Sequence, residues 1–65
     1  MARLKRGERQ RRRRTIFSKV WSSFGVKESE IADETGLHRR VVNNYLHELE
    51  DDGDIHKDGW YWYHD

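Results

Sequence analysis

The sequence contains no cysteine and no proline, and only 34% of its 65 residues are hydrophobic. Without cysteine, neither a disulfide framework nor a cysteine-based zinc site can stabilise the chain. A chain of this length forms one small domain near the lower limit for folding without such staples. Its core must therefore come from a few large side chains, and three tryptophans, three tyrosines and two phenylalanines are present.

Long apolar segments are also missing from the sequence. No run is long enough to span a bilayer, and the N-terminus lacks the apolar stretch of a signal peptide. We therefore expect a cytoplasmic protein that does not associate with a membrane.

The sequence offers no arrangement of residues suited to catalysis or to metal binding. No serine has a histidine and an acid at a defensible spacing, and so small a chain has little room for a pocket. The four histidines include no pair at the spacing of metal ligands, and the acidic segment 48–54 lacks the spacing of a calcium loop. We expect no enzymatic activity, no metal and no cofactor.

The small net charge of +1 conceals two oppositely charged segments. Residues 1–14 contain eight basic residues and one acid, whereas residues 15–65 contain five basic residues and eleven acids. A basic arm on an acidic body is expected when the arm binds a polyanion. We predict that residues 1–14 form a mobile arm, that residues 15–65 form the folded domain, and that four arginines of the arm contact phosphates: Arg11, Arg12, Arg13 and Arg14.

Apolar periodicity predicts three helices. The first runs from about Gln10 to Phe24, the second from about Glu28 to Glu34, and the third from about His38 to Asp51. A turn at Gly36 separates the second helix from the third. Lys27 and His38 stand where a Ser or Thr would usually cap the second and third helices, and both are expected to cap poorly.

The predicted third helix has two unlike faces. Val42, Tyr45, Leu46 and Leu49 follow the i, i+3, i+4, i+7 spacing of one apolar stripe. The opposite side carries polar side chains that pair with phosphates and with guanine and adenine edges, namely Arg39, Arg40, Asn43, Asn44 and His47. This is the combination that a groove-reading helix needs.

The C-terminal segment predicts a β-hairpin, because Asp58-Gly59 separates two β-prone runs. If these two residues form the turn, Lys57 pairs with Trp60 and Ile55 pairs with Trp62, so both tryptophans face the helices. The predicted core comprises Ile16, Phe17, Val20, Trp21, Phe24, Ile31, Ala32, Leu37, Val42, Leu46, Leu49, Ile55 and Trp62.

The order of three helices and a hairpin, with Glu30-Ile31-Ala32, Gly36-Leu37 and Gly53 at their spacing, resembles a winged helix-turn-helix DNA-binding domain of prokaryotic transcription regulators. The resemblance implies a mainly α fold with a C-terminal β-hairpin, in which helix 38–51 enters the major groove and the hairpin, or wing, touches the backbone or the minor groove. Carried over by position, the contact residues are His38, Arg39, Arg40, Val41, Asn43, Asn44 and His47, with Lys57 in the wing.

A narrower resemblance concerns winged domains that bind left-handed nucleic acid. These use a basic residue, an Asn four positions later, a Tyr four positions after that, and a Trp in the wing. Arg39, Asn43 and Trp62 are similarly placed, but His47 occupies the Tyr position and our pairing buries Trp62.

The sequence thus predicts a DNA-binding protein, a transcription regulator associated with the nucleoid, whose partner is double-stranded DNA. A homodimer through the aromatic hairpin or the first helix is compatible with it. The acid-rich, lysine-poor body would suit high salt, so a prokaryotic source that includes archaea is expected. Two alternatives stay open: a winged-helix module for protein–protein interaction, and a binder of RNA or left-handed duplex.

Overall fold

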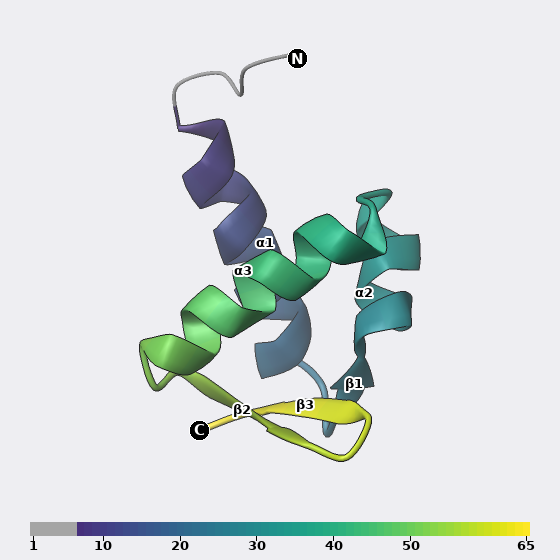
Figure 1. Ribbon diagram of the computed structural model, residues 1–65, viewed down its shortest axis with the longest axis vertical. Coiled ribbons are helices and arrows are strands. Elements are labelled where there is room, and N and C mark those ends of the chain that lie inside the picture. The colour runs from purple at the N-terminus through teal and green to yellow at the C-terminus, as the bar shows by residue number, and fades with distance from the viewer. Residues whose placement is uncertain (1–6) are drawn as a thin grey trace.

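The computed structural model of the chain describes residues 7–65, which form three helices and three short strands (Figure 1). In chain order these are α1 (Glu8–Trp21), β1 (Val26–Lys27), α2 (Glu28–Thr35), α3 (Arg39–Asp51), β2 (Ile55–Asp58) and β3 (Tyr61–His64). Three helices followed by a hairpin confirm the predicted fold class. In the part of the chain that the structure describes, no helix is both long and apolar enough to cross a membrane.

α1 begins at Glu8, inside the segment that the sequence assigned to a mobile arm. Arg9 donates a hydrogen bond of 2.5 Å to Glu48 of α3, and Arg13 pairs with Asp52 beside the end of α3. These acids neutralise cations that would repel one another on an isolated helix, so part of the arginine run is ordered against the domain itself. The boundary of the folded domain is therefore not at residue 14, and residues 1–6 of the predicted arm lie outside the described residues.

α1 ends at Trp21, three residues earlier than predicted. The hydroxyl of Ser22 donates to the carbonyl of Ser18 and that of Ser23 to the carbonyl of Val20, both at 2.8 Å. Such side-chain bonds compete with the helical backbone pattern and end the helix. The prediction that Phe24 and Trp21 belong to the core is wrong, because Phe24 is fully exposed and Trp21 is 55% exposed.

β1 is an element that the sequence did not predict. It pairs antiparallel with β3, placing Val26 opposite Trp62, and the strand order in the sheet is β1-β3-β2. Val26 is buried in the core. A strand of two residues is too short to show the alternating pattern by which strands are detected, so periodicity does not reveal it.

The wing, residues 55–64, forms the predicted hairpin in a different register. Gly59 and Trp60 form the turn, so Asp58 pairs with Tyr61 and Lys57 pairs with Trp62. Gly59 has φ +63, and a glycine at the first turn position is what a type II′ turn requires. The predicted turn at Asp58-Gly59 is wrong by one residue, and the shift carries Trp60 out of the core, where it is 79% exposed.

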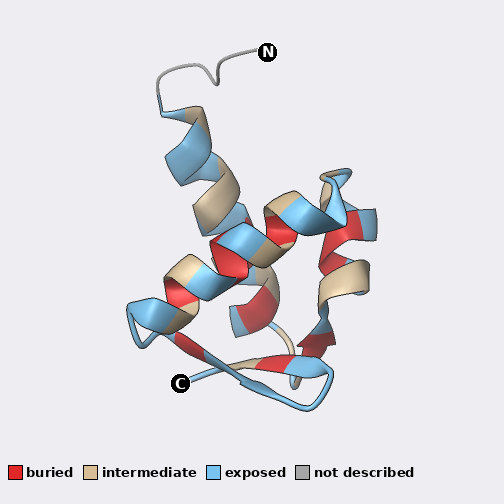
Figure 2. Ribbon diagram, viewed as in Figure 1, coloured by how far each residue is buried: buried red, intermediate tan, exposed pale blue. Residues whose placement is uncertain are grey.

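The core lies where α1, α2, α3 and the sheet meet, and every helix and strand contributes to it (Figure 2). Phe17 and Leu37 were predicted as core and pack against it while partly buried. Tyr45 is buried, in agreement with the predicted stripe of α3. The buried residues are Ile16, Val20, Val26, Ile31, Ala32, Val42, Tyr45, Leu46, Leu49, Ile55 and Trp62.

Candidate nucleic-acid interface

The outward side of α3 carries most of the predicted contact residues. The stripe Val42, Tyr45, Leu46 and Leu49 is buried against the rest of the domain. Val41 packs partly buried against the core and so is turned away from the outer side. The remaining predicted residues of α3 are exposed or half-buried, namely Arg39, Arg40, Asn43, Asn44 and His47.

The start of α3 is fixed by the turn before it and by His38. Gly36 takes the left-handed conformation that ends α2, and the amide of Leu37 donates to the hydroxyl of Thr35 at 3.3 Å. The Nδ1 atom of His38 accepts a hydrogen bond of 3.1 Å from the amide of Arg40. The expectation that His38 caps poorly is therefore wrong, whereas Lys27 makes no side-chain cap for α2. The Nδ1 atom of His38 therefore serves as the side-chain cap of α3.

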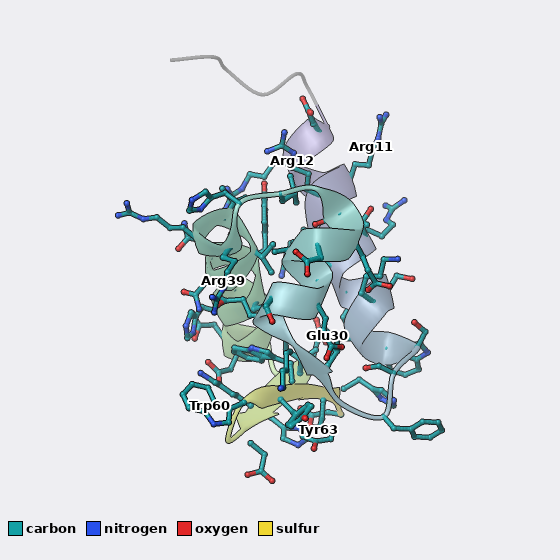
Figure 3. All side chains as sticks on the ribbon, turned by 90° about the vertical axis from the view of Figure 1, so that its right-hand side faces the viewer. Arg11, Arg12, Glu30, Arg39, Trp60 and Tyr63 are labelled. Carbon is teal, nitrogen blue, oxygen red and sulfur yellow. The ribbon has the colours of Figure 1, made fainter. Side chains whose placement is uncertain are left out.

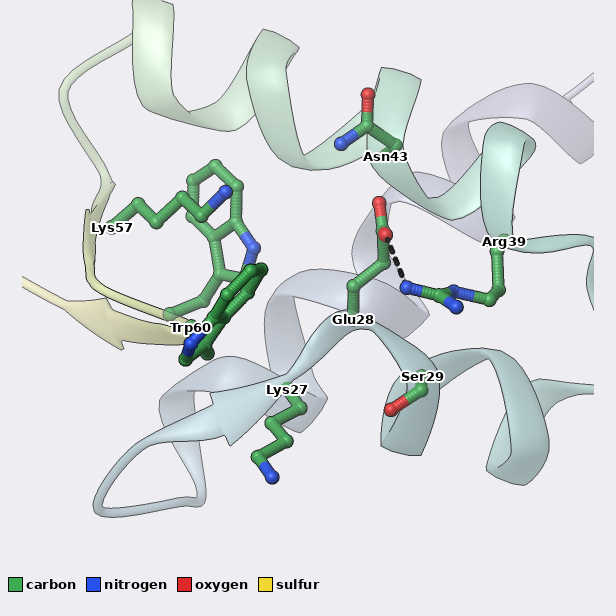
Figure 4. A pocket seen from close by; sticks show the side chains of 8 residues that line it. Lys27, Glu28, Ser29, Arg39, Asn43, Lys57 and Trp60 are labelled. Carbon is green, nitrogen blue, oxygen red and sulfur yellow. Dashed lines mark hydrogen bonds and ion pairs between the residues drawn. The ribbon is translucent and has the colours of Figure 1, made fainter.

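A groove of about 300 Å³ opens between α3, the start of α2 and the wing (Figure 4). We call it the α3–wing groove. It collects Arg39 and Asn43 from one element and Lys57 from another, all three of them predicted contact residues. Its lining residues are Lys27, Glu28, Ser29, Arg39, Asn43, Lys57, Trp60 and Trp62.

Arg39 is held at the edge of the groove by Glu28. Its Nη2 atom lies 3.4 Å from the Oε2 atom of Glu28, and the Arg39 side chain remains 67% exposed. The other carboxylate oxygen of Glu28, Oε1, is buried and has no hydrogen-bond partner. A pair this loose leaves the guanidinium available to an external anion, since exposed ion pairs contribute little to stability.

Trp62 is 1% exposed, as expected from its predicted burial, yet it organises two side chains of the interface. The ring of His47 meets it edge-on, with centroids 5.7 Å apart and an interplanar angle of 86°. The Nζ atom of Lys57 lies 5.7 Å from the centre of the indole. Cation–π and edge-to-face contacts hold both side chains in defined places beside the groove.

The four consecutive arginines of α1 have different surroundings. Arg13 pairs with Asp52, and Arg12 lies 3.3 Å from Glu8 one turn away. The guanidinium groups of Arg11 and Arg14 have no ion pair or hydrogen bond with residues 7–65.

The arginines of α1 also stand apart from the α3–wing groove. Figure 3 shows Arg39 and Trp60 on the side of α3 and the wing, whereas Arg11 points away on the other side. Because a helix turns about 100° per residue, four consecutive side chains cannot share one face. The structure therefore does not bring all four arginines to the side of the predicted contact residues of α3.

Sequence reasoning missed the residues that complete the groove. Lys27 was expected only as a poor cap of the second helix and Glu28 only at the start of that helix, while Trp60 was expected to face the helices. Their place in the groove depends on the pairing of β1 with β3 and on the register of the wing. The one sequence signal for the observed register of the wing was Gly59, because a glycine can also be the first residue of a two-residue turn.

The described residues contain no cluster of three or more His, Cys, Asp or Glu side chains that could hold a metal ion. The interface is built from cations, amides and aromatic rings.

No protein-family model and no curated protein matches the chain. Among solved structures, the chain is similar to ORF112-Zalpha of Cyprinid Herpesvirus3, a structure that describes the binding mode of that protein to Z-DNA. The identity is 26% and the TM-score 0.77, over 86% of this chain and 95% of the other. Together with the three helices and the hairpin, this similarity confirms the winged-helix fold predicted from the sequence.

Proposed function

We propose that this winged-helix chain binds duplex nucleic acid through α3 and the wing, and that it prefers the left-handed form of the duplex. The observation that carries the proposal is the row formed by Arg39, Asn43 and His47 on α3, with His47 held against Trp62 of the wing. This is the order of residues by which the sequence resembles binders of left-handed nucleic acid, with histidine in place of tyrosine. The similar ORF112-Zalpha binds Z-DNA.

The charges of the interface support contacts with phosphates. Arg39 and Arg40 begin α3, and Lys27 and Lys57 line the groove from the other side. Lys27 and Lys57 lie over aromatic rings and have no carboxylate partner in the described chain. Each phosphate that such a cation neutralises adds about −0.9 to the slope of log affinity against log salt.

The shape of the interface supports the left-handed form. A right-handed duplex offers a deep major groove to an inserted helix. Here α3 is flanked by the wing and by the start of α2, and the three elements form a groove. The acids from Glu48 to Asp54 would also repel phosphates if the whole length of α3 entered a major groove.

A second candidate is a transcription regulator that reads the major groove of right-handed DNA. Arg40 and Asn44 favour it, because both are exposed on α3 and their side chains have no partner among residues 7–65. Arginine pairs with guanine edges and asparagine with adenine edges. In this case the arginines of α1 and of residues 1–6 would contact phosphates of the flanking duplex.

The two candidates are separated by binding measured with fluorescence anisotropy. The probes are an alternating CG duplex with methylated cytosines, held in the left-handed form, and a mixed-sequence right-handed duplex of equal length. We expect tighter binding to the first probe, weakening with salt. Addition of protein to the unmethylated alternating duplex should also invert its circular dichroism. Equal affinity for both probes without such inversion would overturn the preference, and absence of binding at low salt would overturn the function itself.

Adjacent asparagines provide matched variants. Asn43→Ala removes an amide that lines the groove, and Asn44→Ala removes one outside it. In the proposed mode, Asn43→Ala costs about 1–3 kcal/mol of binding free energy on the left-handed probe and Asn44→Ala costs less. A larger loss for Asn44→Ala, confined to particular right-handed sequences, would favour the transcription regulator.

A further inference from the structure

Trp60 stands at the tip of the wing with its ring in solvent. It is the second residue of the turn after Gly59 and is 79% exposed. None of residues 7–65 stacks on its ring or places a cation over it. The ring lies at the edge of the charged α3–wing groove, where its face is open to a stacking partner.

The groove beside Trp60 contains groups that recognise a nucleotide. Asn43 and Arg39 line the same groove from α3, with the Arg39 guanidinium directed at Glu28 (Figure 4). The side chains of Asn43 and Ser29 have no hydrogen-bond partner in the described part of the chain. Three cations line the groove against one acid, Glu28, which is already paired with Arg39. The surplus of positive charge suits an anionic ligand.

From this arrangement we infer that Trp60 stacks on a nucleobase that has left the helical stack, while the cations of the groove hold the phosphates beside it. A paired base inside a duplex has both faces covered by its neighbours and cannot offer one to Trp60. The ligand is therefore a duplex that carries an unpaired nucleotide, at a bulge or where two duplex segments join. This inference rests on the proposed binding of duplexes and adds a ligand class to the same groove.

The chemistry of the contact does not depend on which base is presented. Every base has a π-face, and stacking on an aromatic side chain is sequence-tolerant. Lys27 and Arg39 then supply positive charge where the backbone of the extruded nucleotide leaves the duplex. The gain should appear with any base and vanish when the base is removed from its sugar.

The test uses three labelled duplexes of one sequence: a blunt duplex, the same duplex with a single bulged nucleotide, and the same duplex with an abasic bulge. Fluorescence anisotropy measures the affinity of the full chain for each. We expect the base-containing bulge to bind about fivefold to a hundredfold more tightly than the abasic bulge, the usual range for one stacked base. Equal affinity for the two bulges would overturn the inference.

Two further variants identify the ring responsible. Trp60→Ala should abolish the difference between the base-containing and abasic bulges, and Trp60→Tyr should restore part of it. Phe24→Ala is the matched control, because Phe24 is also an exposed aromatic residue but lies in the loop after α1. A difference that survives Trp60→Ala, in a variant whose thermal melting is unchanged, would sink the inference.

Failure of the two proposals can be told apart. If the blunt duplex binds normally but the base in the bulge adds nothing, only the role of Trp60 is wrong. If the base-containing bulge binds and the blunt duplex does not, the role of Trp60 stands and the proposed duplex function fails. If no probe binds, both proposals are wrong.

Discussion

His47 and Trp62 meet edge to face, with ring centroids 5.7 Å apart and an interplanar angle of 86°. His47 belongs to the outer side of α3, whereas Trp62 is among the most buried residues of the domain. The contact therefore fixes an interface side chain against the core. Edge-to-face pairs of this kind contribute about 0.5–1.5 kcal/mol beyond their burial.

The first prediction follows from this contact. His47→Ala should weaken binding to left-handed duplex by about twofold to tenfold, because the contact that orders the site is lost. His47→Tyr should bind at least as tightly as the natural chain, since its ring keeps the edge-to-face contact. Anisotropy titrations on the methylated alternating duplex measure both. Unchanged affinity for His47→Ala would show that the imidazole is not part of the interface.

The second prediction concerns Glu28, the one acid of the α3–wing groove. Glu28→Gln removes a negative charge beside the expected phosphates and releases Arg39 from its ion pair, so the duplex should bind more tightly at low salt. Asp33→Asn is the control, since it changes the net charge equally from an exposed position of α2 outside the groove. If both variants improve binding to the same extent, only net charge matters and the groove is not the binding site.

The third prediction concerns the ion pair between Arg13 and Asp52, which joins α1 to the end of α3. Both side chains are partly exposed, so the coupling free energy in a double-mutant cycle with Arg13→Ala and Asp52→Asn should be about 0.2–1 kcal/mol. Thermal melts at low and high salt would measure it, and salt should reduce it. Arg11→Ala should leave the melting temperature unchanged, because its guanidinium has no partner among the described residues. Equal changes in melting temperature for Arg11→Ala and Arg13→Ala would contradict the finding that Arg13, and not Arg11, forms an ion pair.

The fourth prediction compares two apolar residues that the sequence placed together in the core. Ile16→Ala should lower the free energy of unfolding by about 2–5 kcal/mol, because Ile16 is completely buried. For so small a domain this approaches the total stability. Phe24→Ala should change stability by no more than about 0.5 kcal/mol, as is usual for surface positions. Denaturant unfolding of both variants provides the measurement, and a large loss from Phe24→Ala would mean that its exposed position is incorrect.

The sequence predicts best what repeats along a single element. The stripe of α3 from Val42 to Leu49 recurs with the helical period, and all four of its apolar members are buried. The turn at Gly36 follows from the same local signals. These features depend on residues close in the chain, so a single sequence contains the information for them.

Features that depend on pairing between distant segments were predicted less well. The register of the wing depends on whether Gly59 is the first or the second residue of the turn. The first alternative leaves Trp60 exposed in the turn, and the second would place it in a strand facing the helices. Lys27 enters the groove only because β1 pairs with β3. Periodicity contains neither choice. Arg39 and Asn43 of α3 and Lys57 of the wing were therefore predicted from the sequence, whereas Lys27, Glu28 and Trp60 of the same groove were not.

The arginine run shows a third limit. The net charge of residues 11–14 was evident from the sequence, but which of these arginines would pair with an acid of the domain was not. Arg13 faces the acids of α3, whereas Arg11, two residues earlier, points away from them. Composition gives the sum of the charges, and only the orientation of the helix decides which of them are neutralised within the domain.

The two-residue strand β1 has a consequence for the way the groove would bind. By pairing with β3 it ties the wing to the residues that open α2, so that Lys27 and Tyr61 are cross-strand neighbours. The pairing thereby joins two of the three elements that line the groove, the wing and the start of α2. An interface prepared in this way loses little conformational entropy on association. It would therefore discriminate among nucleic acids by rigid fit, accepting the backbone geometry that matches its fixed span and excluding those that would require the wing to move.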